Sequence, residues 1–286
     1  MTFIPAFFYL PFGVDRFAER VPLTFPAHQV AVIPLKLWRP RWFDGIALVV
    51  GAGAPDLFYF LTFIDGFTSH HLSGIAVAVP FTVIYSIVLR RYAVDGLFGS
   101  MPNFGPLKAR SYRVLSKGRP RFTITLWSAL IGVLSHIGVD SFTHSGRLGA
   151  RFFGLQRVLF DGPDGPVTAA KTLQYLGHTV GSLIGMILFV LVVSKKHLGE
   201  WYGTDVVDAA KAAPVRPGAR RRALLILTGS LWIGAVWGVA FGASVPVFHM
   251  GFTLVMGLLL VGIVNRQPTQ IVARGTLGEC STESRL

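Results

Sequence analysis

The feature of this sequence that most constrains its fold is a series of long apolar stretches with almost no charge. A helix needs about 20 residues to cross a bilayer, because each residue advances it by about 1.5 Å. Six stretches come close to or reach that length: 46–64, 73–89, 122–139, 174–194, 223–242 and 245–264. They predict an all-α fold, a polytopic transmembrane bundle. A seventh, shorter stretch, 25–38, predicts either a short N-terminal helix or a re-entrant segment.

Composition supports a membrane protein over a soluble one. Charged residues make up 14% of the chain and hydrophobic residues 52%, whereas soluble domains carry about 25% charged residues. This balance excludes a disordered chain and argues against a soluble globular enzyme. The single cysteine, Cys280, excludes an internal disulfide framework.

The formal charge of +13 could indicate nucleic-acid binding, but the basic residues follow the topology of a membrane protein. Eight Lys or Arg lie at 90–121 and seven at 195–222, and all fall on one side of the membrane if the six helices alternate. The opposite side holds only Arg147, Arg151, Arg157 and Lys171. Basic loops stay in the cytoplasm. We therefore expect an integral membrane protein with a cytoplasmic C-terminus and no nucleic-acid partner.

The chain divides by composition into five parts. Residues 1–20 are an N-terminal extension, interrupted by Pro5, Pro11 and Gly13, and one hypothesis is that translation begins at Val21. A helical domain at 21–194 precedes a basic cytoplasmic loop at 195–222, a helical hairpin at 223–264 and a disordered tail at 265–286. Gly234, Gly238 and Gly242 permit close helix contact, so the hairpin predicts a scaffold or a homodimer surface.

Ionisable groups at membrane depth are costly and are functional candidates. Within 135–144, three of them follow at intervals of four residues, which advances about 40° per step and places all three on one helix face. All the candidates fall in the extracytoplasmic half, although only Lys and Arg set the topology. They are His28, Asp56, His70, His136, Asp140, His144 and His178.

Histidine and aspartate are the ligands that hold zinc or a similar divalent ion. We predict one or two such ions, with Asp56 orienting or deprotonating an attacking water. Gly51, Gly53 and Pro55 favour a locally opened helix that brings Asp56 to the site. The alternative is that these groups are hydrogen-bonding struts between helices. Three further histidines are expected outside the ligand set: His71 flanks the site, His249 is structural and His197 lies on the cytoplasmic side.

Several motifs resemble a bacterial membrane family known as domain of unknown function 4184. They are PLTFPAH at 22–28, GAGAPD at 51–56, HHLSG at 70–74, SHIGVDSFTH at 135–144 and LQY at 173–175. The resemblance covers about 21–191 and supports Val21 as the start. It implies a location in the plasma membrane of a bacterial cell.

The family is in turn distantly similar to inner-membrane metal-dependent hydrolases and to zinc-dependent phospholipase C. That similarity implies a zinc cluster on the six ligands from His28 to His144 in chain order, with His178 as a seventh, and hydrolysis of a lipid-like phosphoester. The chain departs from the phospholipase pattern at Ser182, where those enzymes have a glutamate.

The sequence therefore predicts a metal-dependent hydrolase that acts on a membrane lipid or amphiphile at the extracytoplasmic face. Two alternatives stay open. One is an ion- or proton-coupled transporter in which Asp56 and Asp140 relay protons or bind a cation. The other is a non-catalytic membrane protein with a structural metal.

Overall fold

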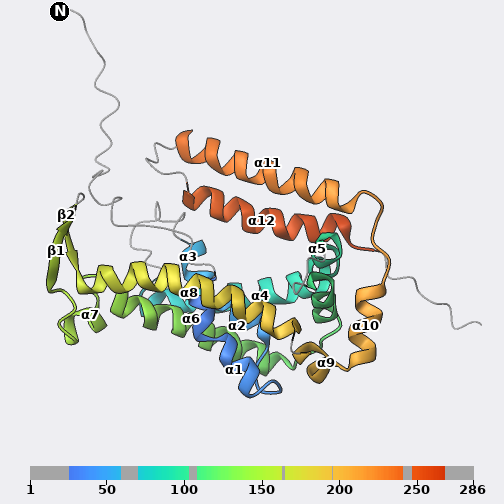
Figure 1. Ribbon diagram of the computed structural model, residues 1–286, viewed down its shortest axis with the longest axis horizontal. Helices are drawn as coiled ribbons and strands as arrows, with labels where there is room; N and C mark the ends of the chain where they lie inside the picture. The colour runs from blue at the N-terminus through green and yellow to red at the C-terminus, as the bar shows by residue number, and fades with distance from the viewer. Residues whose placement is uncertain are drawn as a thin grey trace, which may run out of the picture.

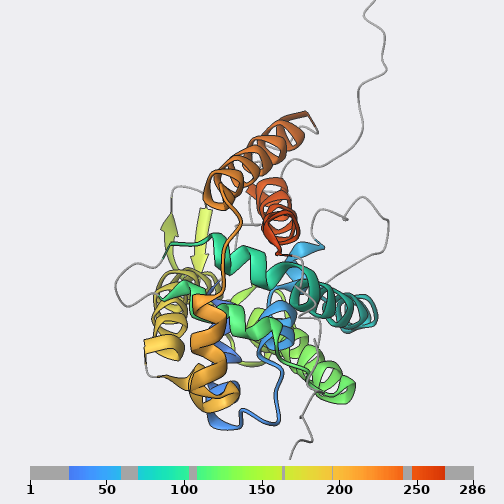
Figure 2. The same ribbon diagram turned by 90° about the vertical axis from the view of Figure 1, so that its right-hand side faces the viewer.

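The computed structural model describes residues 26–58, 70–102, 108–162, 165–194, 196–240 and 247–267, and it is helical almost throughout. Two long helices, α6 (Phe122–Thr143) and α8 (Ala169–Ser194), run along one layer of the molecule (Figure 1). A hairpin of α11 (Ala219–Ala240) and α12 (Val247–Asn265) lies over that layer and is set apart from it in Figure 2. The predictions for residues 1–20 and for most of the tail lie outside the described residues.

Four helices of the described residues are long and apolar enough to cross a membrane: Ile75–Ser100, Phe122–Thr143, Ala169–Val192 and Ala219–Ala240. An all-α membrane protein is thus confirmed, whereas six spanning helices are not found in the part of the chain that the structure describes. The predicted helix at 245–264 is present as α12, an apolar helix of 19 residues.

The predicted helical stretch at 46–64 is interrupted at Ala52 and Gly53, and its part beyond Phe58 lies outside the described residues. Helix α2 (Gly45–Gly51) ends there and α3 (Ala54–Leu57) begins with Pro55 in its first turn. The Gly53 amide donates to the carbonyl of Val50, so the Val49 carbonyl loses its usual helical donor. The buried side chain of Gln29 donates to that carbonyl at 3.3 Å instead. This confirms the predicted opening before Asp56.

The predicted end of the second helix at residue 89 is also wrong. Helix α4 (Ile75–Val88) continues through a π-helical turn, η5 (Leu89–Ala93), into α5 (Val94–Ser100). The sequence suggested an end here because Arg90 and Arg91 follow. Arg90 is instead buried inside the bundle, where its Nη2 donates to both carboxylate oxygens of Asp44 at 2.5 and 2.6 Å. The ion pair neutralises the arginine, so the helix passes through this position.

The segments expected to be loops are largely ordered. The short elements are η4 (Leu72–Gly74), η6 (Ala109–Ser116), α7 (Leu148–Phe152), α9 (His197–Tyr202) and α10 (Thr204–Ala212). Strands β1 (Val158–Gly162) and β2 (Gly165–Thr168) pair antiparallel, with Val158 opposite Thr168 and Gly162 opposite Gly165. The seventh predicted stretch forms a 3-10 turn, η2 (His28–Ala31), and a short helix, α1 (Ile33–Trp38), neither long enough to span a bilayer.

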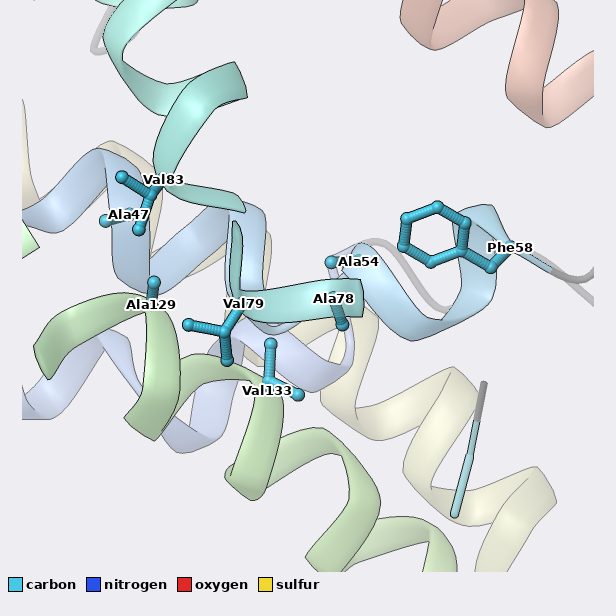
Figure 3. Close-up of a cluster of buried hydrophobic side chains, with 8 residues drawn as sticks. All are labelled: Ala47, Ala54, Phe58, Ala78, Val79, Val83, Ala129 and Val133. Carbon is cyan, nitrogen blue, oxygen red and sulfur yellow. The ribbon is translucent and has the colours of Figure 1, made fainter. Parts of the chain in front are cut away.

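The core between the helices is built of small apolar residues. Figure 3 shows the cluster in which α2, α3, α4 and α6 meet; its members are Ala47, Ala54, Phe58, Ala78, Val79, Val83, Ala129 and Val133. Large apolar side chains lie outside instead, and Trp232 on α11 is 73% exposed. This distribution suits a bilayer, since lipid is as apolar as leucine and small residues let helices approach.

Helices α2 and α6 run in the same direction and touch backbone to backbone. At one end the Asp44 amide donates to Ser128 Oγ at 2.8 Å, and at the other the carbonyl of Ala52 lies 2.8 Å from His136 Nδ1. Between these contacts, a Cβ atom on Gly132 would lie 2.7 Å from the Leu48 carbonyl oxygen. The crossing therefore depends on glycine, and it sets the height at which His136 meets the broken end of α2.

We expect Gly132→Ala to push α2 and α6 apart and to lower the stability of the protein by about 1–3 kcal/mol, as overpacking of a close contact does. Thermal unfolding of the purified protein in detergent measures the loss. Gly138→Ala is the matched control on the same helix, because no atom lies within 4 Å of a Cβ there. Equal unfolding temperatures for the two variants would show that the crossing tolerates a methyl group.

Candidate metal centre

Five of the predicted ligands come together at the break between α2 and α3. His28 comes from η2, Asp56 from α3, His70 from the turn before η4, and His136 and Asp140 from α6. All but Asp56 are buried. His136 and Asp140 are one helical turn apart on α6, so their side chains share a face. Asp56 reaches that face from α3, after the break, whereas His28 and His70 reach it from η2 and from the turn before η4.

The ligand atoms of this cluster are spaced as they are around a metal ion. His70 Nε2 lies 3.1 Å from His136 Nε2 and 3.3 Å from Asp140 Oδ2, and the last two are 3.6 Å apart. Ligands of tetrahedral zinc, at bonds of about 2.0–2.1 Å, are separated by about 3.3–3.4 Å. His70, His136 and Asp140 therefore form one group that could hold a metal ion.

A second group of three shares His136. It contains His28, Asp56 and His136, and its ligand atoms also lie within 4.8 Å of one another. Asp56 Oδ1 lies 3.2 Å from His70 Nε2 and 3.5 Å from His136 Nε2, so it borders both groups. The His28 ring stacks on the His136 ring with centroids 4.0 Å apart. Its Nε2 is 3.6 Å from Asp140 Oδ1. Its buried Nδ1 has no hydrogen-bond partner among the described residues.

Backbone contacts orient the two central histidines. The His136 Nδ1–H donates to the Ala52 carbonyl at 2.8 Å, in the tautomer that leaves Nε2 as an acceptor towards the cluster. Arg147 Nη1 donates to the backbone carbonyl of His70 at 2.6 Å. Burial lowers the pKa of His70. A neutral imidazole is the form that binds metal, so burial favours the His70 ring as a ligand.

The two remaining predicted ligands lie at the edge of the cluster. His144 Nδ1 is 3.7 Å from Asp140 Oδ1, and Gln174 Nε2 donates to His144 Nε2 at 3.0 Å. This hydrogen bond to Gln174 occupies one of the two ring nitrogens of His144. His178 is half-buried on α8 and interacts electrostatically with Asp56, Asp140 and His144. Neither residue belongs to the two groups of three. The face predicted from the four-residue spacing exists, but only its first two members reach the centre.

The other three histidines lie outside the two ligand groups, as predicted. His71 is exposed. His249 stands edge-on to Trp237 at 5.0 Å between ring centroids, and His197 contacts Glu200 at 2.9 Å. None of the three belongs to either ligand group in the described part of the chain.

Sequence reasoning missed two residues that support the site, Gln29 and Arg147. Gln29 is a polar residue directly after His28 in an apolar stretch, which was a usable signal. Arg147 is one of only four basic residues on the side predicted to be extracytoplasmic. Its position close after His144 could have marked it as a functional group. Neither signal identifies the hydrogen-bond partner. The partners are the backbone carbonyl groups of Val49 and His70, and every residue has such a group, so a sequence pattern cannot single them out.

Comparison with known proteins gives one match. The family described as domain of unknown function (DUF4184) matches residues 21–272. The match extends beyond the predicted limit near residue 191 and includes α11 and α12. No curated protein and no solved structure matches the chain. The distant similarity to metal-dependent hydrolases and to phospholipase C therefore stays a prediction.

Proposed function

This chain belongs to the DUF4184 family, and we propose that it is an integral membrane hydrolase that uses a divalent metal ion held by its buried His/Asp cluster. The observation that carries the proposal is the set of ligand-atom distances between His70, His136 and Asp140, which run from 3.1 to 3.6 Å. Four buried ionisable groups converge inside an apolar bundle. Buried ionisable groups are costly in such a setting, and a bound cation would offset the charge of the carboxylates.

The cluster suits one ion better than two. Because Nδ1 of His136 is bonded to the Ala52 carbonyl, only Nε2 is available, and the two ligand groups share that atom. We therefore propose a single ion held by His70, His136 and Asp140, with His28 packed against the His136 ring. Two imidazoles and a carboxylate match the preferences of zinc.

Asp56 is the group placed to move a proton. Its side chain is 22% exposed, whereas that of Asp140 is 3% exposed, so Asp56 is the carboxylate that water can reach. A bound divalent ion supplies a Lewis acid and an activated water in hydrolases. In the proposed reaction Asp56 accepts a proton from the attacking water at a carboxylate oxygen and returns it to the leaving alcohol oxygen.

Apolar surface next to the cluster supports an amphiphilic substrate. Helix α7 packs directly on the end of α6, where a Cβ atom on Gly149 would lie 2.9 Å from the Ser141 carbonyl oxygen. It places Phe153 5.4 Å from Phe142 and 5.1 Å from Phe152, between ring centroids. Phe152 is 83% exposed. Such aromatic groups suit the interface of a bilayer. We propose a membrane lipid or another amphiphilic ester or phosphoester as the substrate.

Transport, the alternative expectation, requires a polar path across the bundle. The described core between α2, α4 and α6 is mainly alanine and valine, which favours a site that works from one face. A structural metal without catalysis would give the same cluster, so turnover must be measured.

Asp56→Asn is expected to lower hydrolysis of a labelled phospholipid by about 10²–10⁴-fold, the usual contribution of a general base, while metal content stays near one ion per chain. Purified protein loaded with zinc in mixed micelles is the assay. Asp161→Asn on β1 is the matched control, because it makes the same chemical change at an exposed aspartate. Wild-type protein that binds zinc but releases no product would favour a structural metal.

A further inference from the structure

A second chemically distinctive region lies at the opposite end of α6 from the His/Asp cluster. It is a cavity of about 800 Å³ between α4, α5, η6 and the start of α6. Thr125 and Phe122 line it, and Thr125 precedes His136 by eleven residues, or roughly 16 Å along the helix. The cavity is therefore separate from the proposed hydrolase site. It lies at the end that the loop charges predict to face the cytoplasm.

The cavity is strongly basic. Asp95 is the one carboxylate among its described lining residues. It pairs with Arg113 at 3.0 Å, and Arg90 is paired with Asp44. The other four cations have no carboxylate partner within 4.0 Å in the described residues. The six basic residues that line it are Arg90, Arg91, Arg113, Lys117, Arg119 and Arg266.

Hydrogen bonds to backbone carbonyl groups hold two of the basic residues that line the cavity in place. Arg113 is buried, and its Nη1 donates to the Ala213 carbonyl at 2.5 Å while its Nη2 donates to the Pro214 carbonyl at 3.3 Å. Arg119 Nη1 donates to the carbonyls of Ser116 and Gly118 at 2.9 and 3.0 Å, which folds the loop around the cavity. These bonds hold the basic segments together against their mutual repulsion.

Helix α6 adds a further positive field. Phe122 is its first residue, and its N-cap, Arg121, makes no side-chain capping bond. The N-terminus of a helix carries a partial positive charge on free amide groups, and it attracts anions. The cations without a carboxylate partner and this helix end line the same cavity, so an anion there would interact with both.

One edge of the cavity is apolar. Ile87 on α4 and Phe122 on α6 both line it and are 45% and 62% exposed. Both belong to helices long enough and apolar enough to span a membrane, so their exposed side chains are suited to contact with lipid chains. A ligand that joins an acidic group to an apolar chain would fit both parts of the lining. A basic pocket between membrane helices is a known form of recognition of lipid headgroups.

We propose that this cavity binds a phosphate group, and specifically the headgroup of an anionic phospholipid whose chains lie along Ile87 and Phe122. Arginine side chains bind phosphate through paired N–H donors, and lysine through a compact charge. The proposal does not depend on the hydrolase function, because none of its residues belongs to the His/Asp cluster.

The test is a titration of the purified, delipidated full chain in neutral detergent with phosphatidylglycerol, phosphatidylcholine or inorganic phosphate, followed by native mass spectrometry. Wild-type protein is expected to retain phosphatidylglycerol in preference to phosphatidylcholine. The double variant Arg91→Gln/Lys117→Gln is expected to bind phosphatidylglycerol at least about tenfold more weakly, given the usual effect of each basic residue near a membrane. Arg151→Gln/Arg157→Gln removes the same charge at exposed positions outside the cavity and is the matched control.

The three ligands distinguish the sources of the phosphate. Tight binding of inorganic phosphate with no preference for phosphatidylglycerol would keep a phosphate site but overturn the assignment to a lipid. Equal loss of phosphatidylglycerol in both double variants would overturn the site itself, since overall charge alone would then explain the binding. Both variants alter exposed side chains, so unfolding temperatures close to the wild type are expected and can be checked on the same samples.

Discussion

Replacing His136 by alanine is expected to reduce bound metal from about one ion per chain to below about 0.2, because metal affinity depends on a complete, correctly oriented ligand set. His136 is fully buried, belongs to both ligand groups and contacts His28, His70, Asp56 and Asp140. The substitution also leaves the Ala52 carbonyl without its donor. Elemental analysis of the protein purified in detergent measures the change.

A second variant keeps this result interpretable. The alanine variant opens a cavity and could lose metal through unfolding, whereas Asp140→Asn keeps the shape of the side chain and removes only the charge. It is expected to lose the ion as well while remaining folded. His197→Ala removes an exposed histidine whose contact is with Glu200, and it should retain the full metal content. Wild-type protein that carries no divalent metal, or an Asp140→Asn variant that keeps it, would rule out the proposed centre.

Asp44→Ala is expected to destabilise the protein by about 3–5 kcal/mol, as the loss of one partner from a buried ion pair does. Asp44 and Arg90 are both buried, and the carboxylate also accepts from Thr125 Oγ1 at 2.9 Å and from the Ile46 amide at 3.1 Å. The substitution therefore removes the N-cap of α2 and leaves a guanidinium without its counter-ion inside the bundle. Chemical unfolding in detergent, followed by tryptophan fluorescence, measures the difference.

The double variant Asp44→Leu/Arg90→Met distinguishes the effect of an unpaired buried charge from the effect of changing these two positions. It removes both charges and fills the space with apolar atoms, so it is expected to unfold within about 1–2 kcal/mol of the wild type. Glu200→Ala breaks the exposed contact with His197 and should change stability by less than about 1 kcal/mol. If Asp44→Ala were no more destabilising than Glu200→Ala, the ion pair would have no structural role.

The coarse fold could be predicted from the sequence because the bilayer imposes a simple rule. Long uncharged stretches must be helical there, since every backbone polar group has to be satisfied within the segment. That rule located α4, α6, α8 and α11. It failed at α2, where glycines and Pro55 break the helix and other side chains, Gln29 and His136, satisfy the freed carbonyls. Length and hydropathy carry no information on such long-range partners.

The members of the candidate site could be predicted for a related reason. An ionisable side chain in an apolar stretch stands out, and His28, Asp56, His70, His136 and Asp140 were all identifiable in that way. The sequence did not show which of the candidate residues lie at the centre of the site and which lie at its edge. His144 has the same four-residue spacing from Asp140 as His136, yet Gln174 binds it at the edge. Helical spacing fixes the face of a side chain but not its distance from residues on other helices.

The sequence by itself determined that this chain is a helical membrane protein with a small set of acidic and histidine side chains at one end of its apolar segments. Both conclusions follow from the free energy of placing charged and apolar groups in a bilayer, which each residue contributes locally. Only the tertiary structure decided which of those groups meet, how α2 crosses α6 through Gly51 and Gly132, and that Arg90 lies inside the bundle against Asp44. These depend on contacts between distant residues, such as Asp44 with Arg90, 46 positions apart, and Ala52 with His136, 84 positions apart. Close packing between helices is specified by the shapes of both partners together.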